Sequence, residues 1–444
     1  MDGDEEFERG REYATRRDEA DPLANLADRF YDPEDEWYVD GNSLGLLSED
    51  AEDALDSAVE EWRDLAIRGW TDADPQWFHY GERLGDRLAP LVGADESEVV
   101  VANSTTVNIH TLVGTFYDRA RRADGDSSER TKIIVDDLDF PTDHYAIRAQ
   151  LRQRGVDPDE ALTVVESRDG RTIAEEDVIA AMDEDTAIAF LPSVLYRSGQ
   201  LLDLERITEA AHEKGILAGF DLAHSVGVVP HDLSDIGADF AVWCSYKYLN
   251  AGPGSIAGLY VNSDHFGKTP ALAGWWGHEK ETQFDMNPTY TPAADAGAYQ
   301  IGTIPILSAA PLAGSLDVFE DAAAASDGRL RAGVEAVREK SLSLTGYLAF
   351  LVDERLPDCE VGTPRDAERR GGHVAVEHPE AYRVCEALKE RGVVADFRPP
   401  NVIRICPSPL YTGFEDVWEV VEQLTQVVDD AEYENFAERG GGVT

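Results

Sequence analysis

Short apolar runs separated by amphipathic stretches fill the middle of the chain. The runs lie at residues 132–136, 187–194, 216–221, 238–244 and 255–261. Between them, residues 143–155 and 204–214 have helical patterns. Apolar runs of about four to eight residues that alternate with helices are typical of βαβ units around a buried parallel sheet. The pattern therefore predicts an α/β fold with a mostly parallel sheet.

The flanking regions have other patterns. Residues 48–63 predict an amphipathic helix, with Ser48 as its N-cap and acidic residues in its first turn. Residues 309–352 are almost entirely helical in pattern, and residues 361–438 mix short strands with helices. We expect an N-terminal arm at 1–50, a large domain at 51–312, and a linking helix with a small α+β domain at 313–444.

Acidic residues dominate the charge of the chain. There are 88 Asp and Glu against 39 Lys and Arg, which gives a formal net charge of -49. Because so few cations are present, we expect no nucleic-acid partner and no anionic membrane surface. Hydrophobic residues make up 43% of the chain, which indicates a folded core under a carboxylate-rich surface. Such surfaces suit salt that screens self-repulsion, so we expect a halophilic source; the alternative is an ordinary acidic soluble protein.

The cysteines and the apolar segments indicate a cytoplasmic protein. Four cysteines are widely spaced, without any C-x-x-C pair: Cys244, Cys359, Cys385 and Cys406. We expect neither a disulfide framework nor a metal site. The first 17 residues lack the apolar segment of a signal peptide. No apolar run approaches the roughly 20 residues that cross a bilayer.

Lys247 differs from the other lysines in its surroundings. It follows the apolar run at 238–244 and stands between two tyrosines, and residues 240–262 contain no Asp or Glu. A lysine that reacts as a nucleophile needs a pocket of low dielectric. The alternative is a lysine at a strand end whose amine reaches solvent.

Asp221 ends another apolar run and is followed closely by His224. Ligands of open α/β sheets bind at the carboxyl ends of the strands. A carboxylate there can pair with the pyridinium nitrogen of pyridoxal phosphate, which lets that cofactor act as an electron sink. The alternative is a solvated aspartate in a turn, with His224 as a plain turn residue.

Residues 103–106 (Asn-Ser-Thr-Thr) connect an apolar run to a helical pattern. Hydroxyl and amide groups at a helix N-terminus form an anion site, and residues 99–117 contain no acid that would repel a phosphate. The alternative is an ordinary Ser/Thr N-cap.

Two loops carry aromatic residues. In one, Phe140 is placed to stack on a ring and Asp143 to cap the next helix; the alternative is a plain turn. In the other, Trp275 and Trp276 are adjacent. Tandem tryptophans are unusual on an exposed loop without a binding role, so they form either core or an aromatic binding wall.

Together these segments resemble the kynureninase family, whose members are pyridoxal-phosphate enzymes of fold type I, the aspartate-aminotransferase fold. The resemblance runs from about residue 38 to residue 417. Its most specific parts are residues 219–224 (GFDLAH) and 239–252 (DFAVWCSYKYLNAG). Residues 38–45 (YVDGNSLG), 274–279 (GWWGHE) and 401–407 (NVIRICP) support it.

The resemblance implies that the chain binds pyridoxal 5'-phosphate. Lys247 matches the lysine that bonds to the cofactor, Asp221 the partner of the ring nitrogen, and Tyr246 a cofactor contact placed to relay protons. Other positions match further cofactor contacts: Thr105 and Thr106 at the phosphate, Phe140 on the ring, Asp143 and His224.

The resemblance also implies a homodimer with shared active sites. Trp275 and Thr303 match residues that reach the cofactor from the neighbouring subunit. Arg404 matches the arginine that holds the substrate's α-carboxylate, a role that suits its planar fork. The alternative for Arg404 is a structural ion pair. The candidates for the aryl pocket are Trp70, Trp275, Trp276 and His278; for Trp70 the alternative is a core or interface position.

Two positions depart from some members of the family. Pro192 stands where these relatives carry a hydroxyl contact, so either the adjacent Ser193 replaces it or the contact is missing. Gly69 and Trp70 stand where some relatives have an aryl-pocket histidine. The choice between kynurenine and 3-hydroxykynurenine is therefore left open.

The implied activity is hydrolytic cleavage of the Cβ–Cγ bond of L-kynurenine to anthranilate and L-alanine, in tryptophan catabolism. One alternative is another fold type I enzyme such as a cysteine desulfurase, which needs a reactive cysteine on a mobile loop. The other is a non-catalytic acidic binding protein on the same scaffold.

Overall fold

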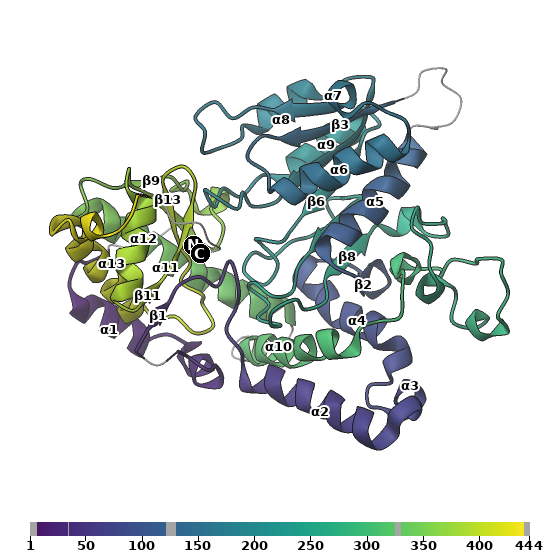
Figure 1. Cartoon of the computed structure of the whole chain (residues 1–444), viewed down its shortest axis with the longest axis horizontal. Helices are drawn as coiled ribbons and strands as arrows, with labels where there is room; N and C mark the ends of the chain where they lie inside the picture. Colours follow the sequence, from purple (N-terminus) through teal and green to yellow (C-terminus); the bar gives the residue numbers. More distant parts are fainter. Residues whose placement is uncertain (1–6, 34, 121–129, 325–329, 439–444) are drawn as a thin grey trace.

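A seven-stranded sheet forms the centre of the computed structural model, which describes residues 7–33, 35–120, 130–324 and 330–438 (Figure 1). In spatial order its strands are β2 (Val99–Val101), β8 (Gly258–Val261), β7 (Phe240–Trp243), β6 (Leu217–Asp221), β5 (Thr186–Pro192), β3 (Lys132–Asp136) and β4 (Leu162–Val165). The strands from β7 to β4 pair in parallel. The predicted α/β class with a mostly parallel sheet is confirmed.

Strand β8 departs from the fully parallel pattern that the apolar runs suggest. It pairs antiparallel with both β7 and β2. A parallel neighbour needs a long crossover connection, usually a helix. The chain instead returns from β7 to β8 through residues 244–257, which contain no helix. This returning loop carries Lys247.

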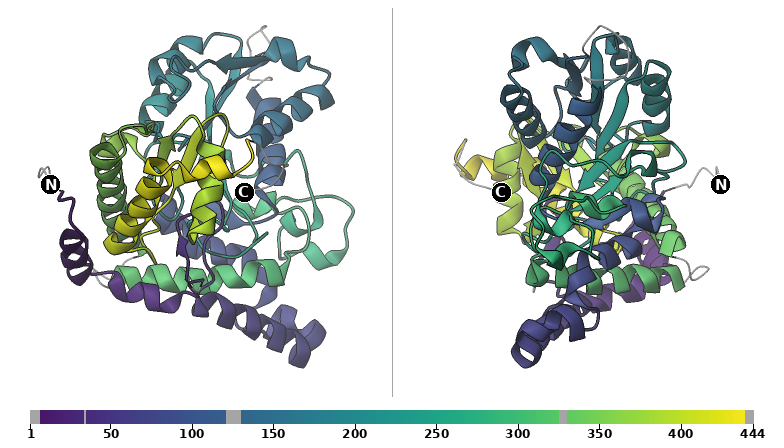
Figure 2. Two further views of the ribbon diagram at one scale, coloured as in Figure 1. Left: turned by 60° about the vertical axis from the view of Figure 1, so that its left-hand side comes forward. Right: turned by 90° about the vertical axis from the view of Figure 1, so that its right-hand side faces the viewer.

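Helices cover both faces of the sheet (Figure 2). On one face lie α4 (Tyr80–Val92), α8 (Glu175–Ala181) and α9 (Leu204–Glu213), and on the other lie α5 (Thr105–Ala120) and α6 (Pro141–Gln153). Alternate residues of β3 serve the two cores: Ile134 joins the first, whereas Ile133 and Val135 join the second. This burial on both sides explains the continuous apolar runs in the sequence.

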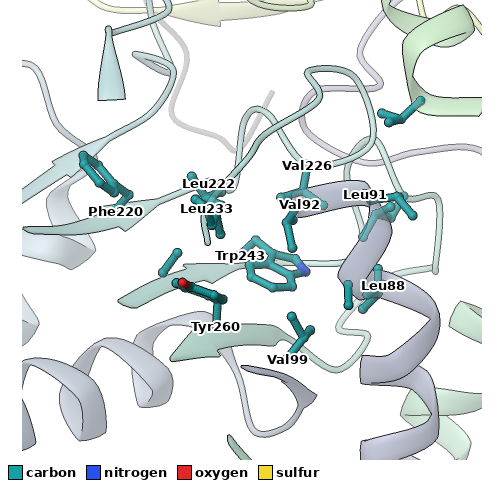
Figure 3. Close-up of a cluster of buried hydrophobic side chains, with 14 of the residues drawn as sticks. Leu88, Leu91, Val92, Val99, Phe220, Leu222, Val226, Leu233, Trp243 and Tyr260 are labelled. Atoms are coloured by element: carbon teal, nitrogen blue, oxygen red, sulfur yellow. The ribbon is translucent and has the colours of Figure 1, made fainter. Parts of the chain in front are cut away.

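Trp243, at the end of β7, anchors the strand that precedes Lys247 (Figure 3). Its side chain is fully buried, and Leu88 and Val92 of α4 lie beside it. Gly258 is its partner on β8, where a Cβ atom would lie 2.3 Å from the indole. The indole therefore fills the space that this glycine leaves.

A smaller sheet lies to one side of the large one (Figure 1). Its antiparallel strands are β12 (Asp396–Arg398), β13 (Val402–Ile405), β10 (Val374–Glu377) and β9 (Glu360–Val361). Together with α11 (Leu330–Arg355), α12 (Ala381–Glu390) and α13 (Phe414–Asp429) it buries a core of its own. The helical pattern at 309–352 corresponds to α10 (Ile306–Ala324) and α11.

The N-terminal segment runs along the smaller unit and then reaches the large sheet. Helix α1 (Arg11–Glu19) packs on α13, and β1 (Trp37–Tyr38) pairs in parallel with β11 (Val393–Val394). Helix α2 (Glu49–Leu65) lies along α10 and leads to the short α3 (Gly69–Asp72). The Ser48 hydroxyl accepts a hydrogen bond from the Ala51 amide at 3.1 Å, so the predicted N-cap is confirmed.

The domain boundaries at residues 50 and 312 remain a prediction. Across the described residues, every helix is too short or too polar to cross a membrane.

Candidate active site

A cavity of about 340 Å³ lies at the edge of the large sheet where β3, β5, β6 and β7 end. Its walls come from the loops after these strands, the start of α5, the N-terminal segment and the smaller sheet. The predicted site residues that line it are Thr105, Thr106, Phe140, Asp221, His224, Tyr246, Lys247 and Arg404. The edge of the sheet thus brings together residues that are far apart in the sequence.

Lys247 reaches this cavity from the loop between β7 and β8. Its Nζ lies 2.8 Å from Nε2 of His224. The amide of Gly45 donates to the Tyr246 carbonyl at 2.8 Å, and the amide of Asn250 donates to the Lys247 carbonyl at 2.9 Å. These backbone contacts hold the loop in place.

His224 is a neutral acceptor for the lysine. Burial lowers the pKa of its imidazole well below the usual value, and the charge of Lys247 lowers it further. Its Nδ1 is buried and has no hydrogen-bond partner among the described residues. His224 thus contacts Lys247 through Nε2, while its Nδ1 remains available to a polar ligand atom.

Four buried aspartates lie where β3 and β6 end. Burial raises the pKa of the carboxyl groups of Asp136, Asp139, Asp143 and Asp221, and repulsion from other members of the group raises the pKa of Asp139 and Asp143 further. Asp221 and Asp139 line the cavity, whereas Asp143 lies behind, against both of them. The sequence prediction named Asp143 and Asp221 but missed Asp136 and Asp139, which the Asp-rich stretch after β3 could have indicated.

Hydroxyl groups gather at the N-terminus of α5. Thr105 and Thr106 begin the helix, and Thr106 Oγ1 lies 2.9 Å from Thr142 Oγ1 at the start of α6. All three line the cavity. Helix N-termini and hydroxyls favour a bound anion. Thr142 was not predicted.

Phe140 and Tyr246 form part of the wall. Phe140 is 48% exposed and meets Tyr196 edge-on, with the ring centroids 5.3 Å apart. The pKa of the Tyr246 hydroxyl is raised, chiefly by the neighbouring Cys244 and then by burial. Tyr246 therefore keeps its proton at neutral pH.

The hydroxyl of Ser193 is bonded within the protein, and Ser193 is not among the described residues that line the cavity. Pro192 lines the cavity, but the buried Ser193 hydroxyl donates to the Asp221 carbonyl at 3.2 Å. It also lies 2.7 Å from the hydroxyl of Ser225. The described lining residues at the end of β5 are Pro192, Val194 and Tyr196, so the lining gives no support to a phosphate contact by Ser193.

Arg404 is buried and already paired. Its Nε donates to Asp396 Oδ1 at 2.7 Å, and its Nη2 donates to Asp396 Oδ2. Its Nη1 donates to the Tyr196 carbonyl at 2.8 Å and its Nη2 to the Ser43 hydroxyl at 2.9 Å. The structural ion pair left open by the sequence is thus present, and Arg404 also lines the cavity. The sequence prediction missed Asp396 and its second partner, Arg398.

Besides Asp143, five predicted residues are not among the described residues that line this cavity: Trp70, Trp275, Trp276, His278 and Thr303. Trp276 is buried against Trp70, with the ring centroids 5.4 Å apart. His278 is also buried and is held by Thr282 and Thr291. Trp275 and Thr303 are exposed. The two tandem tryptophans therefore divide: Trp276 is core and Trp275 is surface.

The cavity fits the group that the sequence resemblance implies. It combines an anion site at α5, a lysine amine, a buried carboxyl group and an aromatic wall. The unpartnered Nδ1 of His224 is one position where a polar ligand atom could complete a hydrogen bond. The volume lies within the range of about 300–1,000 Å³ that is usual for small-molecule sites. Pyridoxal phosphate carries the matching phosphate, aldehyde and ring nitrogen.

Known structures confirm the fold. An apo cysteine desulfurase from Thermococcus onnurineus NA1 matches with a TM-score of 0.74 and 18% identity, over 91% of this chain and 98% of that one. A cysteine desulfurase from Escherichia coli matches with a TM-score of 0.71 and 20% identity, over 93% and 98%. At such identities the match shows the fold type alone.

Sequence comparison identifies the family. Residues 337–424 match the profile named "Kynureninase C-terminal domain". A kynureninase from Geobacillus thermodenitrificans is 50% identical over 428 residues, 96% of each chain. A kynureninase from Bacillus cereus is 50% identical over 434 residues, 97% of each chain. The chain therefore belongs to the kynureninase family of pyridoxal-phosphate-dependent hydrolases.

Proposed function

We propose that this protein uses water to cleave the Cβ–Cγ bond of L-kynurenine, which gives anthranilate and L-alanine. The supporting observation is the convergence of Lys247, His224 and Asp221 on one cavity, in a chain of this family. When bound, pyridoxal phosphate supplies an electron sink for bonds at the substrate's Cα and Cβ.

The residues of the cavity divide the work of holding the cofactor. Thr105 and Thr106 hold its phosphate at the start of α5, and Asp221 pairs with its ring nitrogen. Phe140 covers one face of the ring. Asp143 acts from behind, through its contact with Asp221.

Two side chains move protons. Lys247 takes the proton from the substrate's Cα, and the neutral His224 orients its amine through the 2.8 Å contact. Tyr246 keeps its hydroxyl proton and donates it at a later step. Arg404 receives the substrate's α-carboxylate.

We further propose a homodimer that completes each site. Trp275 and Thr303 are exposed, and the exposed apolar side chains of Phe284 and Met286 lie on the same segment as Trp275. In the dimer, Trp275 and Thr303 reach the partner's cofactor, and Trp70, Trp276 and His278 shape the aryl pocket. Mixing the inactive Trp275→Ala and Lys247→Ala variants then restores part of the activity, because one site per mixed dimer is intact. No gain on mixing would contradict shared sites.

We also propose that the protein comes from a halophile and folds best in high salt. A net charge of -49 on a folded chain implies strong self-repulsion, which salt screens.

One assay tests the activity. The holoprotein, purified in high salt, is given L-kynurenine, and anthranilate fluorescence and L-alanine are followed together. We expect equal amounts of both, and a parallel assay with 3-hydroxykynurenine measures the preference. Lys247→Ala abolishes turnover, whereas Lys389→Ala on α12 leaves it unchanged. A folded holoprotein that forms no anthranilate overturns the proposal.

A cysteine desulfurase activity has less support. Burial raises the pKa of the thiols of Cys359 and Cys406 to about 12, and those of Cys244 and Cys385 are also raised. Thiols in this state are weak nucleophiles. Sulfide release from L-cysteine would favour this activity. A protein that stays colourless after reconstitution with pyridoxal phosphate would instead favour a non-catalytic binding protein.

A further inference from the structure

Two arginines of the smaller sheet face the cavity beside a single carboxylate. Arg398 ends β12 and Arg404 lies on β13, opposite Asp396 in the antiparallel register. Residues two apart on a strand share a face, so Asp396 and Arg398 point the same way, and Arg404 joins them across the strand pair. Both arginines line the cavity.

The two guanidinium groups differ in how many of their nitrogen atoms donate hydrogen bonds to the protein. Arg404 is 1% exposed, and its Nε, Nη1 and Nη2 all donate to Asp396, Tyr196 or Ser43. The Arg398 side chain is 28% exposed, and its Nη2 lies 2.5 Å from Asp396 Oδ2. Its Nη1 reaches only the Phe397 carbonyl, at 3.5 Å, and its Nε has no hydrogen-bond partner among the described residues.

The cluster of Arg398, Arg404 and Asp396 carries more positive than negative charge, so it can bind an anion. Arg398 and Arg404 both pair with Asp396, so two positive charges share one negative charge. The nearby Asp40 offsets only part of the excess, because burial and the repulsion of Asp396 raise the pKa of its carboxyl group to about 7. An arginine stays protonated even when buried. The cluster therefore has an excess of positive charge on the side that faces the cavity.

We propose that Arg398 is a second substrate-binding residue, which receives the substrate's α-carboxylate together with Arg404. The inference rests on the proposed function, since it assigns one more contact to the same substrate. Asp396 holds both forks in place, and a carboxylate that enters the cavity meets the Nη groups of Arg398, whose donors are only partly used. Charged hydrogen bonds of this kind discriminate strongly between a carboxylate and its absence.

The test compares a ligand that has the α-carboxylate with one that lacks it. Steady-state kinetics give KM and kcat for L-kynurenine, and inhibition gives Ki for kynuramine, the decarboxylated analogue. For Arg398→Gln we expect KM to rise about 10- to 100-fold while Ki for kynuramine changes less than about twofold. Arg206→Gln, the same change in a surface ion pair with Glu176, leaves both values as in the wild type.

Further measurements separate the other outcomes. Equal weakening of both ligands, or a KM within about threefold of the wild type, overturns the proposal. A raised dissociation constant for pyridoxal phosphate with unchanged KM also overturns it, because Arg398 would then serve the cofactor. If Arg398→Gln does not fold, Arg398→Lys keeps the charge and removes the fork. A KM within about twofold of the wild type for that variant overturns the proposal. A wild-type protein that releases no anthranilate contradicts the proposed function instead.

Discussion

The amine of Lys247 and the Nε2 atom of His224 lie 2.8 Å apart, although the two residues come from different strand ends. Burial keeps the imidazole neutral, so it accepts a hydrogen bond from the lysine. This contact fixes the direction in which the amine points. Proton transfer depends on such positioning.

His224→Ala is therefore expected to lower kcat by about 10- to 100-fold, because the amine loses its orientation. His224→Gln keeps an acceptor near the amine and should lose less. The release of anthranilate measures both. His212→Gln, at a partly exposed histidine paired with Asp239, is the control and should keep full activity. Full activity in His224→Ala would show that the contact is dispensable.

The convergence of the central residues was predictable from local signals. Asp221 and Lys247 each follow an apolar run, and parallel strands end at one edge of the sheet. Thr105 and Thr106 at the start of α5 likewise follow an apolar run, the one that forms β2. In each case the sequence pattern predicts the strand, and the arrangement of strands in the sheet brings the residues that follow them to one cavity.

Other features depend on pairings that no local pattern contains. The contact of Arg404 with Asp396 arises from the register of β12 and β13. The antiparallel direction of β8 follows from the lack of a crossover helix between residues 243 and 258. The apolar run of β8 itself has the same pattern as the parallel strands, so it does not indicate this direction. Trp275 and Trp276 are neighbours in the sequence, but one is exposed and the other is core. Composition alone does not distinguish them.

Gly45 lies against the loop that carries Lys247. A Cβ atom at this position would lie 2.1 Å from Asn250 Oδ1 and 2.5 Å from the Lys247 carbonyl oxygen. Because the second atom belongs to the backbone, the loop must move. Gly45→Ala is expected to cost about 1–3 kcal/mol of stability and to reduce kcat. Thermal unfolding and anthranilate release measure the two effects. Gly302→Ala, with no heavy atom within 4 Å, is the control for stability.

Asp396 joins two arginines in a buried cluster. Asp396→Asn leaves two guanidinium groups side by side without their carboxylate. Removal of one partner from a buried pair costs about 3–5 kcal/mol. Urea unfolding should show a loss of this order. Asp177→Asn breaks the exposed pair with Arg168 and should cost less than about 1 kcal/mol. Equal losses in the two variants would contradict the role of burial.

The charge of the chain makes its stability depend on salt. The Debye length falls from about 10 Å in 0.1 M salt to about 3 Å in 1 M salt, so repulsion among surface carboxylates weakens. We expect Tm to rise steadily over this range of KCl. A neutral osmolyte at equal osmolality should give a smaller rise, because it does not screen charge. A flat or falling Tm in KCl would contradict the halophilic interpretation.

His231 couples stability to pH. Burial lowers the pKa of its imidazole to about 3, and its Nε2 lies 2.8 Å from the Ser225 hydroxyl. In the unfolded chain the pKa returns to about 6.5. Below pH 6.5 the native state therefore binds fewer protons than the unfolded state, and stability falls as the pH falls. At pH 5 this residue alone costs about 2 kcal/mol relative to pH 7.

His231→Gln removes the titrating group but keeps a polar atom near Ser225. Its free energy of unfolding should therefore fall less steeply between pH 7 and pH 5 than that of the wild type, by about 2 kcal/mol. His212→Gln should change the profile in the opposite direction, since the hydrogen bond to Asp239 raises the pKa of His212. Urea unfolding at several pH values measures all three proteins. Parallel profiles for His231→Gln and the wild type would mean that His231 does not set the acid limit of the fold.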